Sequence, residues 1–303
     1  MFKPNQLNAF VTVAAQQSIR GAARVLGHSQ PAVTKIVREL ERDLGAALVE
    51  RTVKGVHLTP YGQAFLPRAR LLLEDMRRAR EEIAQIRDGA RGRISVAVST
   101  AFALTLLPAA FSAFHARHPL VDVILTETAL PWMLTGLNDG TLDFAVAHGW
   151  SGAISPDYDV TELYPIKAAV GVRKGHPLRR AKSLTELHAA EWIVPGDGSA
   201  ALGTVAPMFS ALGLAPPARV IQGQSANVAM GLVANMDLVG LFVEPLLQWA
   251  STHYRIVQIN TVETLPNSFV HIVKRKNYPL TPAALQFVDC IKAAAASPPA
   301  RSR

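Results

Sequence analysis

Polar and apolar residues follow a helical period between residues 30 and 44. The apolar positions fall at i, i+3, i+4, i+7 and i+11 and so share one face of a predicted helix: Val33, Ile36, Val37, Leu40 and Leu44. The opposite face carries polar side chains: Gln30, Thr34, Lys35 and Arg38. Ser29 at the N-cap and Pro31 in the first turn, where a missing N–H costs nothing, define where the helix begins.

Two shorter apolar patterns precede this helix. Residues 5–17 predict a first helix, and Ser18 can cap a second one. The residues of the second helix that we expect to face the core are Ala22, Ala23, Val25 and Leu26. Residues 27–29, Gly-His-Ser, form a turn. The whole stretch therefore predicts a helix-turn-helix whose last helix exposes a polar face.

A short β-like stretch follows, at residues 48–58, after a stop signal at Gly45. It is broken at Lys54 and Gly55, which predicts a small hairpin, or wing. Its outward residues are of the kind that contact phosphates or enter a minor groove: Arg51, Thr52, Lys54 and His57.

A long helix is predicted from Thr59 and Pro60 onwards. Its apolar residues are spaced alternately four and three apart and form a heptad seam: Phe65, Ala69, Leu72, Met76, Ala79, Ile83 and Ile86. A helix of this length extends roughly 42 Å at 1.5 Å per residue. A lone helix of this kind, flanked by arginines, cannot bury its seam within a small domain, so pairing with a second copy is favoured over packing on its own chain. Pairing would set the last helices of two helix-turn-helix motifs at a fixed separation, as two half-sites of DNA require.

Beyond residues 89–93, which read as a flexible hinge, the pattern changes to alternating strands and helices. Strands are predicted at 94–98, 121–125, 144–147, 168–172, 192–194, 219–222, 238–242 and 269–274. Helices are predicted at 103–117, 131–138, 199–212, 227–234 and 281–295, with a frayed tail at 297–303. This order predicts a parallel α/β sheet in two lobes.

The net charge of +8 sits almost entirely in the first third of the chain. Residues 1–93 hold 16 Lys and Arg against 9 Asp and Glu, whereas residues 94–303 hold 15 against 14. A basic surface that coincides with a helix-turn-helix favours a polyanion as partner. The length of 303 residues predicts two or three domains. A single cysteine, Cys290, and an N-terminus without an apolar signal core predict a cytoplasmic protein.

Ligands of two-lobed α/β domains bind outside the carboxyl ends of strands, next to helix starts. Four stretches meet this description, and we expect them to outline a cleft for a small organic anion. The candidate effector-binding residues are Ser99, Thr100, Ala101, Phe102, His148, Gly149, Trp150, Ser199, Ala200, Ala201, Leu202, Phe242, Glu244 and Pro245. For Ser99 and Thr100, plain helix capping explains the same residue types and is compatible with ligand binding.

No catalytic or metal-binding set emerges from the sequence. Residues 196–201 fit the G-x-G-x-x-A pattern of dinucleotide sites, but the acidic residue expected about twenty positions later is missing. His115 and His118 bring no third metal ligand. A small-molecule-binding protein of transport type, or an enzyme with an accessory DNA-binding domain, remains as an alternative function. We expect no enzyme, no metal and no cofactor.

The N-terminal block resembles the LysR-type transcriptional regulators. The resemblance rests on S-Q-P-A-V-T at 29–34, E-R-D-L-G at 41–45 and L-T-P-Y-G at 58–62, in this order and spacing, and it is strong over residues 5–65. Ile19 stands where the family commonly has Phe, and Val49 where L-F-x-R is usual. Both residues keep apolar character, so these departures concern packing.

The resemblance implies an α/β protein overall, with an N-terminal winged helix-turn-helix, a long dimerising linker helix and a two-lobed, periplasmic-binding-protein-like (type 2) effector domain. By position it implies DNA contacts from Gln30, Pro31, Thr34, Lys35, Arg38 and Arg51, to which we add Arg20, Ser29, Thr52 and Lys54. The effector contacts that it implies are Ser99, Thr100 and residues 199–202. Implied partners are double-stranded operator DNA, further copies of the chain in a homotetramer, RNA polymerase and a small-molecule effector, without a membrane.

These expectations give a domain plan. The predicted parts are a DNA-binding domain at 1–59, a linker helix at 60–88, a hinge at 89–93 and an effector domain at 94–303. Its first lobe takes about 94–164 and 271–303 and its second about 165–270. We expect an anionic metabolite, with aromatic acids among the candidates, to bind between the lobes and change the angle between them. This change would alter the spacing and bend of bound DNA.

Overall fold

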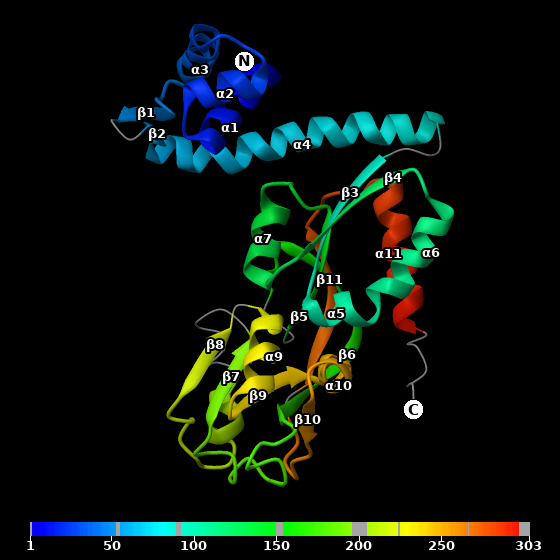
Figure 1. The fold of residues 1–303 in the computed structure, drawn as a ribbon. Coiled ribbons are helices and arrows are strands. Elements are labelled where there is room, and N and C mark those ends of the chain that lie inside the picture. Colours follow the sequence, from blue (N-terminus) through cyan, green and yellow to red (C-terminus); the bar gives the residue numbers. More distant parts are fainter. Residues whose placement is uncertain are drawn as a thin grey trace. The chain divides into compact units, whose positions relative to one another are not determined.

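The computed structural model describes residues 2–52, 55–88, 92–149, 154–195, 205–223, 225–265 and 267–296 (Figure 1). The chain divides into two compact units. Unit 1 comprises Met1–Gly92 and Thr135–Leu142, and unit 2 comprises Arg93–Leu134 and Asp143–Arg303. A short segment from the middle of the chain therefore belongs to the N-terminal unit.

Unit 1 begins with three helices: α1 (Pro4–Gln16), α2 (Ile19–Leu26) and α3 (Gln30–Leu44). The hydroxyl of Ser18 caps α2 by accepting a hydrogen bond from the Gly21 N–H at 3.1 Å. Ser29 caps α3 in the same way, accepting from the Ala32 N–H at 3.3 Å. Both helices end at a glycine in the left-handed region, Gly27 and Gly45. The predicted helix-turn-helix is thus formed by its predicted capping residues.

The three helices share one small apolar core. Its buried residues come from α1, α2, α3 and the hairpin: Ala9, Val13, Ile19, Ala22, Ala23, Val33, Val37 and Val56. Val25 is not among them, because its side chain is 62% exposed, so its predicted place in the core is wrong. Val25 lies two positions after Ala23, about 200° further round the helix, and so leaves the buried stripe.

The predicted hairpin forms from β1 (Val49–Thr52) and β2 (Gly55–Leu58), paired antiparallel. The carboxylate of Glu41 on α3 accepts hydrogen bonds from the N–H groups of Leu48 and Val49, at 2.8 and 3.1 Å. The N–H of Val56 donates to the carbonyl of Gln17 at 2.9 Å. These bonds fix the hairpin against both α1 and α3.

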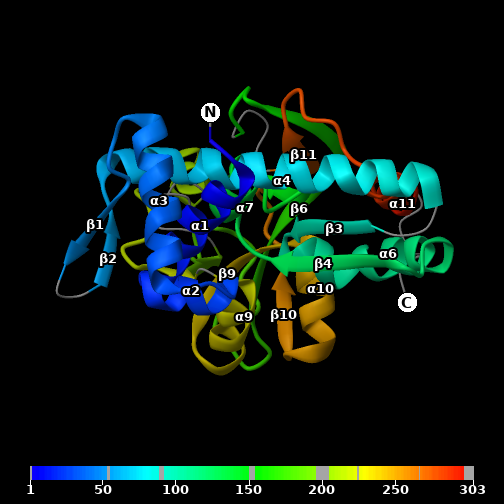
Figure 2. The same ribbon diagram turned by 90° about the horizontal axis from the view of Figure 1, so that it is seen from above.

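The long helix α4 (Pro60–Asp88) starts where Thr59 caps the N–H of Gly62 at 3.0 Å. Figure 2 shows α4 along its length. The first part of the predicted seam packs within the chain, since Ala69 is fully buried in a cluster with Leu7 and Phe10. The later seam residues are open to solvent: Leu72 (38% exposed), Met76 (37%) and Ile83 (65%). The side chain of Ile86 lies outside the described part of the chain.

Unit 2 is built on a mixed nine-stranded sheet among the described residues, in the order β4-β3-β5-β11-β6-β9-β7-β8, with β10 paired to β6. The strands are β3 (Gly92–Val98), β4 (Val121–Glu127), β5 (Phe144–Gly149), β6 (Tyr158–Arg173), β7 (Glu191–Pro195), β8 (Val220–Gly223), β9 (Leu238–Val243), β10 (Ile256–Ile259) and β11 (Asn267–Arg275). Gly92 and Arg93, predicted as hinge, begin β3.

The prediction of a parallel sheet is only partly right. β3 and β5 pair in parallel, as do β7, β8 and β9, but β6 and β11 run antiparallel to each other and to their other neighbours. β6 is far longer than the predicted strand at 168–172. Its first half was not predicted because it is largely exposed and includes charged residues such as Asp159 and Glu162. Such a half-exposed strand lacks the continuous apolar run that marks a buried parallel strand.

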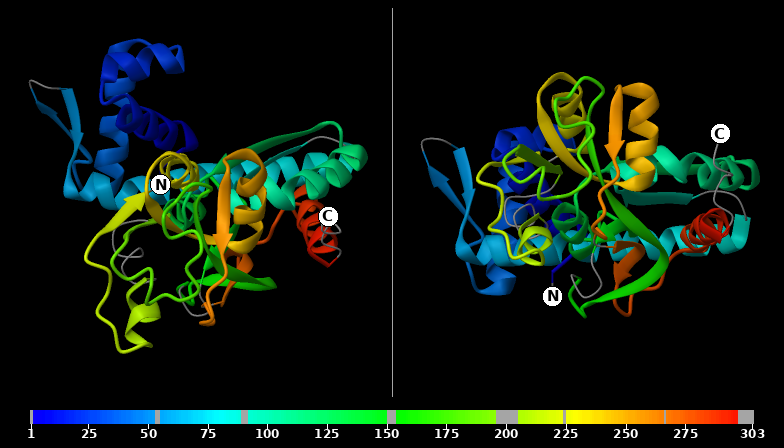
Figure 3. Two further views of the ribbon diagram at one scale, coloured as in Figure 1. Left: turned by 60° about the horizontal axis from the view of Figure 1, so that its bottom comes forward. Right: turned by 90° about the horizontal axis from the view of Figure 1, so that it is seen from below.

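Helices pack on this sheet and form two separate apolar cores with it. The helices are α5 (Thr100–Thr105), α6 (Leu107–Arg117), α7 (Leu130–Asn138), α9 (Ala226–Asn235), α10 (Glu244–His253) and α11 (Pro282–Ala296). α11 lies beside α6 in both views of Figure 3 and contacts it, with the rings of Phe114 and Phe287 at 4.9 Å. α10 was not predicted. Of the predicted helix 199–212, residues 205–210 are helical and residues 199–204 lie outside the described part of the chain. A second core gathers around Trp192 and Phe209.

Several predictions lie outside the described residues. They concern hinge residues 89–91, the tail at 297–303, and the side chains of Lys54, Trp150, Ser199, Ala200, Ala201 and Leu202. Within the described ranges, no helix combines the length and apolar character needed to cross a membrane.

Candidate functional sites

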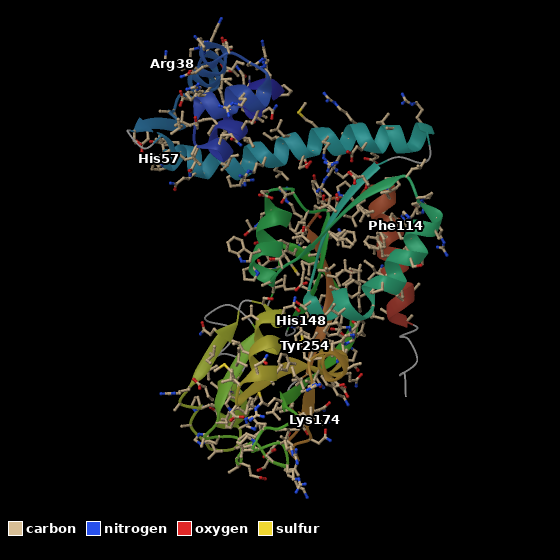
Figure 4. The ribbon with its side chains drawn as sticks, viewed as in Figure 1. Arg38, His57, Phe114, His148, Lys174 and Tyr254 are labelled. Atoms are coloured by element: carbon tan, nitrogen blue, oxygen red, sulfur yellow. The ribbon has the colours of Figure 1, made fainter. Side chains whose placement is uncertain are left out.

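The outer face of α3 is open to solvent along its whole length. Val33 and Leu40 are fully buried beneath it, so the apolar period fixes which side chains point outward. Gln30, Pro31, Lys35 and Arg38 are exposed and Thr34 is half-buried. Figure 4 labels Arg38 on this helix. An α-helix that presents such side chains has the width to enter a major groove.

A shallow depression runs over this face of α3. It is lined by Gln30, Pro31, Thr34, Lys35, Arg38, Glu39 and Arg42. Five of these residues were predicted to contact DNA, whereas Glu39 and Arg42 were missed. Both stand four positions after a predicted residue, Lys35 and Arg38, so the helical period could have found them. Arg42 extends the row of cations toward the C-terminal end of α3.

The other predicted DNA-binding residues have different surroundings. Arg20 is exposed on α2, and Thr52 is exposed on β1, where its hydroxyl donates to the Gly55 carbonyl at 3.4 Å. The Ser29 hydroxyl is engaged in capping α3, which leaves its backbone at the start of the recognition helix. The Arg51 side chain lies outside the description. His57, labelled in Figure 4, is exposed on β2 opposite Glu50.

Ser99 is the most constrained residue of the candidate effector region. It follows β3, and its N–H donates to the carbonyl of Val146 on β5 at 2.9 Å. Its side chain is only 5% exposed, yet its hydroxyl has no hydrogen-bond partner among the described residues and does not cap α5. A buried hydroxyl without a partner costs free energy, so it is a candidate for a ligand contact.

Thr100 has a protein partner that was not predicted. Its hydroxyl donates to the carboxylate of Glu127 at 2.5 Å, and Glu127 is exposed at the end of β4. The predicted strand ended at residue 125, two positions too early, so Glu127 was missed. An acid therefore lies beside a region that we expected to hold an anion.

His148 lies two residues after Val146, near the end of β5, and is labelled in Figure 4. Its side chain reaches solvent, but the protein around it displaces enough water to lower the pKa of His148 below its usual value, and the charge of His271 lowers it further. Its imidazole is therefore neutral at pH 7. Across the ladder, His148 pairs with Val270, and Val270 pairs with Tyr164 on β6.

Tyr164 was also missed, because the first half of β6 was not predicted. Residues directly opposite in a ladder share a face of the sheet, so His148, Val270 and Tyr164 form one row across three strands. Burial raises the pKa of Tyr164 to about 12, so its phenol stays protonated at neutral pH. The row offers two neutral hydrogen-bonding side chains.

Three predicted effector residues pack into the core instead. Ala101, Phe102 and Phe242 belong to the main apolar cluster of unit 2, so their side chains are packing residues. Glu244 and Pro245 are half-buried in the first turn of α10, and Gln248 donates a weak 3.4 Å hydrogen bond to Glu244. α10 contacts α5, so the helices that follow β9 and β3 pack against each other. Gly149 is half-buried at the end of β5.

No cluster of three or more His, Cys, Asp or Glu side chains suited to a metal ion occurs in the ranges that the structure describes. Ser99, Thr100, His148 and Glu127 place hydroxyls, an imidazole and a carboxylate at the ends of β3, β4 and β5. This set can bind and orient a small polar molecule through hydrogen bonds.

Comparison with known families covers nearly the whole chain. Residues 4–63 match the bacterial regulatory helix-turn-helix protein, lysR family, and residues 87–296 match the LysR substrate binding domain. The chain is 28% identical over 295 residues to the HTH-type transcriptional regulator GbpR of Azospirillum brasilense, covering 96% of this chain and 86% of that protein. It is 34% identical over 178 residues to the HTH-type transcriptional regulator PcaQ of Agrobacterium fabrum, covering 58% of this chain and 57% of that protein.

Solved structures agree with these matches. The crystal structure of CbnR, a LysR family transcriptional regulator, aligns with a TM-score of 0.73 at 25% identity, over 97% of this chain and 99% of that one. Full-length CbnR in complex with its target DNA has the same fold, with a TM-score of 0.70 at 24% identity over 97% of this chain and 100% of that one. The chain belongs to the LysR family of helix-turn-helix transcriptional regulators and carries the family's substrate-binding domain as its effector domain.

Proposed function

We propose that a small organic acid binds beside Ser99, Thr100 and His148 and switches the activity of this regulator. The observation that carries the proposal is the Ser99 hydroxyl, which is buried and lacks a partner among the described residues. Ser99 is tied to β5 by its hydrogen bond to Val146, two residues before His148. This hydrogen bond ties the residue that follows β3 to β5, the strand that carries His148.

The chemistry of the region narrows the effector further. The neutral imidazole of His148 can donate a hydrogen bond to an acid, as can the Ser99 hydroxyl. Glu127, when ionised, only accepts hydrogen bonds. We therefore propose an organic acid that also carries a hydroxyl or amino group, with aromatic acids among the candidates. No cofactor is required for this role.

The switch would act on operator DNA. We propose that the acid changes the angle between the two lobes, and that this changes the spacing and bend of DNA held by two copies of α3. The exposed part of the α4 seam, Leu72, Met76 and Ile83, supports pairing of two chains, and a homotetramer is the proposed assembly. RNA polymerase is the proposed further partner, and the cytoplasm is the proposed compartment.

The domain plan is proposed with it. α3 and the β1–β2 wing would read DNA, α4 would dimerise, and the part from β3 onwards would bind the effector. Residues 89–91, between α4 and β3, would act as the hinge. The compact units do not coincide with this plan, because the 135–142 segment groups with α4.

A thermal-shift screen of the full chain tests the effector proposal. Benzoate, salicylate, malate and aspartate are suitable first probes. A ligand present at about a hundredfold its Kd should raise the melting temperature by roughly 5 °C, because it binds only the folded state. The same ligand should change the footprint or bend of bound DNA. Absence of any such change in the presence of a bound acid would contradict the switching mechanism.

A further inference from the structure

The long helix α4 has a buried face, distinct from its exposed seam. Leu71 and Arg78 on this face are buried, at 8% and 6% exposure. Burial of an arginine is costly unless its charge is hydrogen-bonded. Nη2 of Arg78 donates to the carbonyl oxygens of Gly140 and Leu142, at 2.8 and 3.0 Å. The buried arginine thus holds the backbone of a segment 62 residues away in the chain.

Gly140 is shaped for this contact. Its φ of +79° lies in the left-handed region, where side chains other than that of glycine are disfavoured. A Cβ at this position would meet the Glu74 Cβ at 3.1 Å and the Leu71 Cδ1 at 3.2 Å. The segment therefore approaches α4 more closely than a residue with a side chain would allow.

An ion pair supports the same contact. Nη1 of Arg70 lies 3.2 Å from Oδ2 of Asp139, whose side chain is only 10% exposed. Asp139 also accepts hydrogen bonds from the N–H and the hydroxyl of Thr141, at 3.1 and 2.7 Å. Two arginines spaced two turns apart on α4 therefore hold consecutive parts of one short segment.

The held segment leads directly into β5, the strand that carries His148. Leu142 is followed by Asp143, whose carboxylate accepts a hydrogen bond from the Ser95 N–H on β3 at 2.7 Å and whose own N–H donates to the Ser95 carbonyl at 2.8 Å. β5 begins one residue later, and His148 stands at its far end. β5 is paired with β3 on one side and with β11 on the other, so the held segment runs directly into a strand inside the sheet, the strand that carries His148.

We propose that Arg78 and residues 140–142 form a latch between α4 and the segment that precedes β5 in the chain, and that this latch passes the effector signal to the DNA-binding helices. The idea rests on the proposed effector switching, but the latch itself is a feature of the ligand-free chain. Arg78 acts as a positioning residue, since it contacts neither DNA nor effector. Movement of β5 on effector binding would strain or release the two hydrogen bonds that Arg78 donates to the carbonyls of Gly140 and Leu142.

Arg78→Met in the full-length chain tests the latch without any ligand. The control is Arg80→Met, which removes the same charge from an exposed position on the same helix. The amides of Asp139 and Leu142 are bonded to the Thr135 and Gly136 carbonyls, and hydrogen exchange reports on both. We expect exchange at these amides to be at least about tenfold faster in Arg78→Met and unchanged in Arg80→Met. Equal exchange in both variants would overturn the latch.

A second readout separates signalling from structure. An operator selected from random DNA by the wild-type protein is labelled at both ends, and its bend is measured by energy transfer. Arg78→Met should bind it within about twofold of wild-type affinity but with a changed bend or footprint, because α3 is untouched. Arg78→Lys keeps the charge without the planar guanidinium, so the DNA bend that it gives should lie between those of wild type and Arg78→Met. Faster exchange together with an unchanged bend would show that the contact is structural only, and the proposal would fail.

Arg70→Met provides a second route if Arg78→Met does not fold. It removes the partly exposed ion pair with Asp139, so the same two measurements should change in the same direction with smaller size. Failure of the proposed effector binding is distinguishable, because it would appear as absent thermal shifts with organic acids and would leave these ligand-free measurements unaltered.

Discussion

The recognition helix α3 and the effector region of unit 2 assemble their functional side chains in opposite ways. On α3, the exposed candidates from Gln30 to Arg42 lie on one helix, and its buried stripe forces them outward. In the effector region, Ser99, His148 and Glu244 follow or end three different strands, so their relative positions depend on how the sheet pairs. A site on one helix depends on local spacing, whereas an assembled site depends on the whole sheet.

The difference predicts how each region responds to a single change. A truncated α3 side chain should lose its own DNA contact and leave the others in place. A change in the effector region should disturb neighbours contributed by other strands, so its effects should be smaller on DNA and larger on switching. Four experiments test this comparison.

The largest effect is expected from Arg38→Ala on α3. Loss of one DNA-contacting guanidinium should weaken operator binding by about 1–3 kcal/mol, or roughly five- to 150-fold. If Arg38 contacts a phosphate, the slope of affinity against salt should also fall by about one. Fluorescence anisotropy over a salt series measures both quantities, with exposed Arg68→Ala on α4 as the control. Equal affinity of Arg38→Ala and wild type would remove this residue from the DNA-binding face.

Ile83→Asp tests whether the α4 seam pairs two chains and thereby places two copies of α3 in one dimer. Ile83 is 65% exposed, so the substitution leaves the isolated chain folded. In a paired seam it would place an unpaired charge in an apolar contact, and the dissociation constant of the dimer should rise at least about tenfold. Sedimentation measures the assembly, and anisotropy should show a parallel loss of operator affinity. Neighbouring Glu82→Ala should behave as wild type, and an unchanged dimer in Ile83→Asp would place the dimer interface elsewhere.

Ser99→Ala tests the assembled site. Loss of one neutral hydrogen bond to an effector should weaken its binding by about 0.5–1.5 kcal/mol, or roughly two- to tenfold, with operator affinity retained. The measurement is ligand titration by thermal shift with an acid found in the screen. Thr100→Ala should have a smaller effect, because its hydroxyl already donates to Glu127. Loss of DNA binding in either variant would mean that these residues are structural.

His148→Gln should have the smallest effect, on the pH dependence of stability. Since the pKa of His148 is lowered in the folded state, the unfolded chain binds a proton first as the pH falls. The stability that this residue contributes is present above its ordinary pKa, about 6.5, and is lost as the pH falls toward the folded value. The melting temperature of the variant should therefore drop less between pH 7.5 and pH 5.5 than that of wild type. A parallel drop in both proteins would contradict the lowered pKa.

Elements with a local cause were predictable from the sequence. α3 begins at the residue after Ser29 and ends before Gly45, as its capping residues indicate. α4 likewise runs from Pro60 to Asp88, as its seam predicts. The prediction that Val25 faces the core was wrong, because α2 has only eight residues and so short a helix does not define its buried face without the helices that pack on it.

Elements defined by pairing were harder to predict. The first half of β6 is exposed, so it carries no apolar run, and only its partner β11 identifies it as strand. Tyr164 was missed for that reason, and Glu127 because β4 extends two residues beyond the predicted end. Buried Arg78 reads in sequence as one of several arginines flanking the seam of α4, since its acceptors are backbone carbonyls 62 and 64 residues away.

The recognition helix, its wing and the long helix follow from local sequence, because capping residues and apolar periods act over a few residues. The sequence also determined the family, through motifs that lie close together. Only the tertiary structure decided that Thr100 faces Glu127, that His148 and Tyr164 share a row through Val270, and that α4 has a buried arginine face besides its seam. These features arise between segments that meet only when the sheet forms, and no local spacing records them.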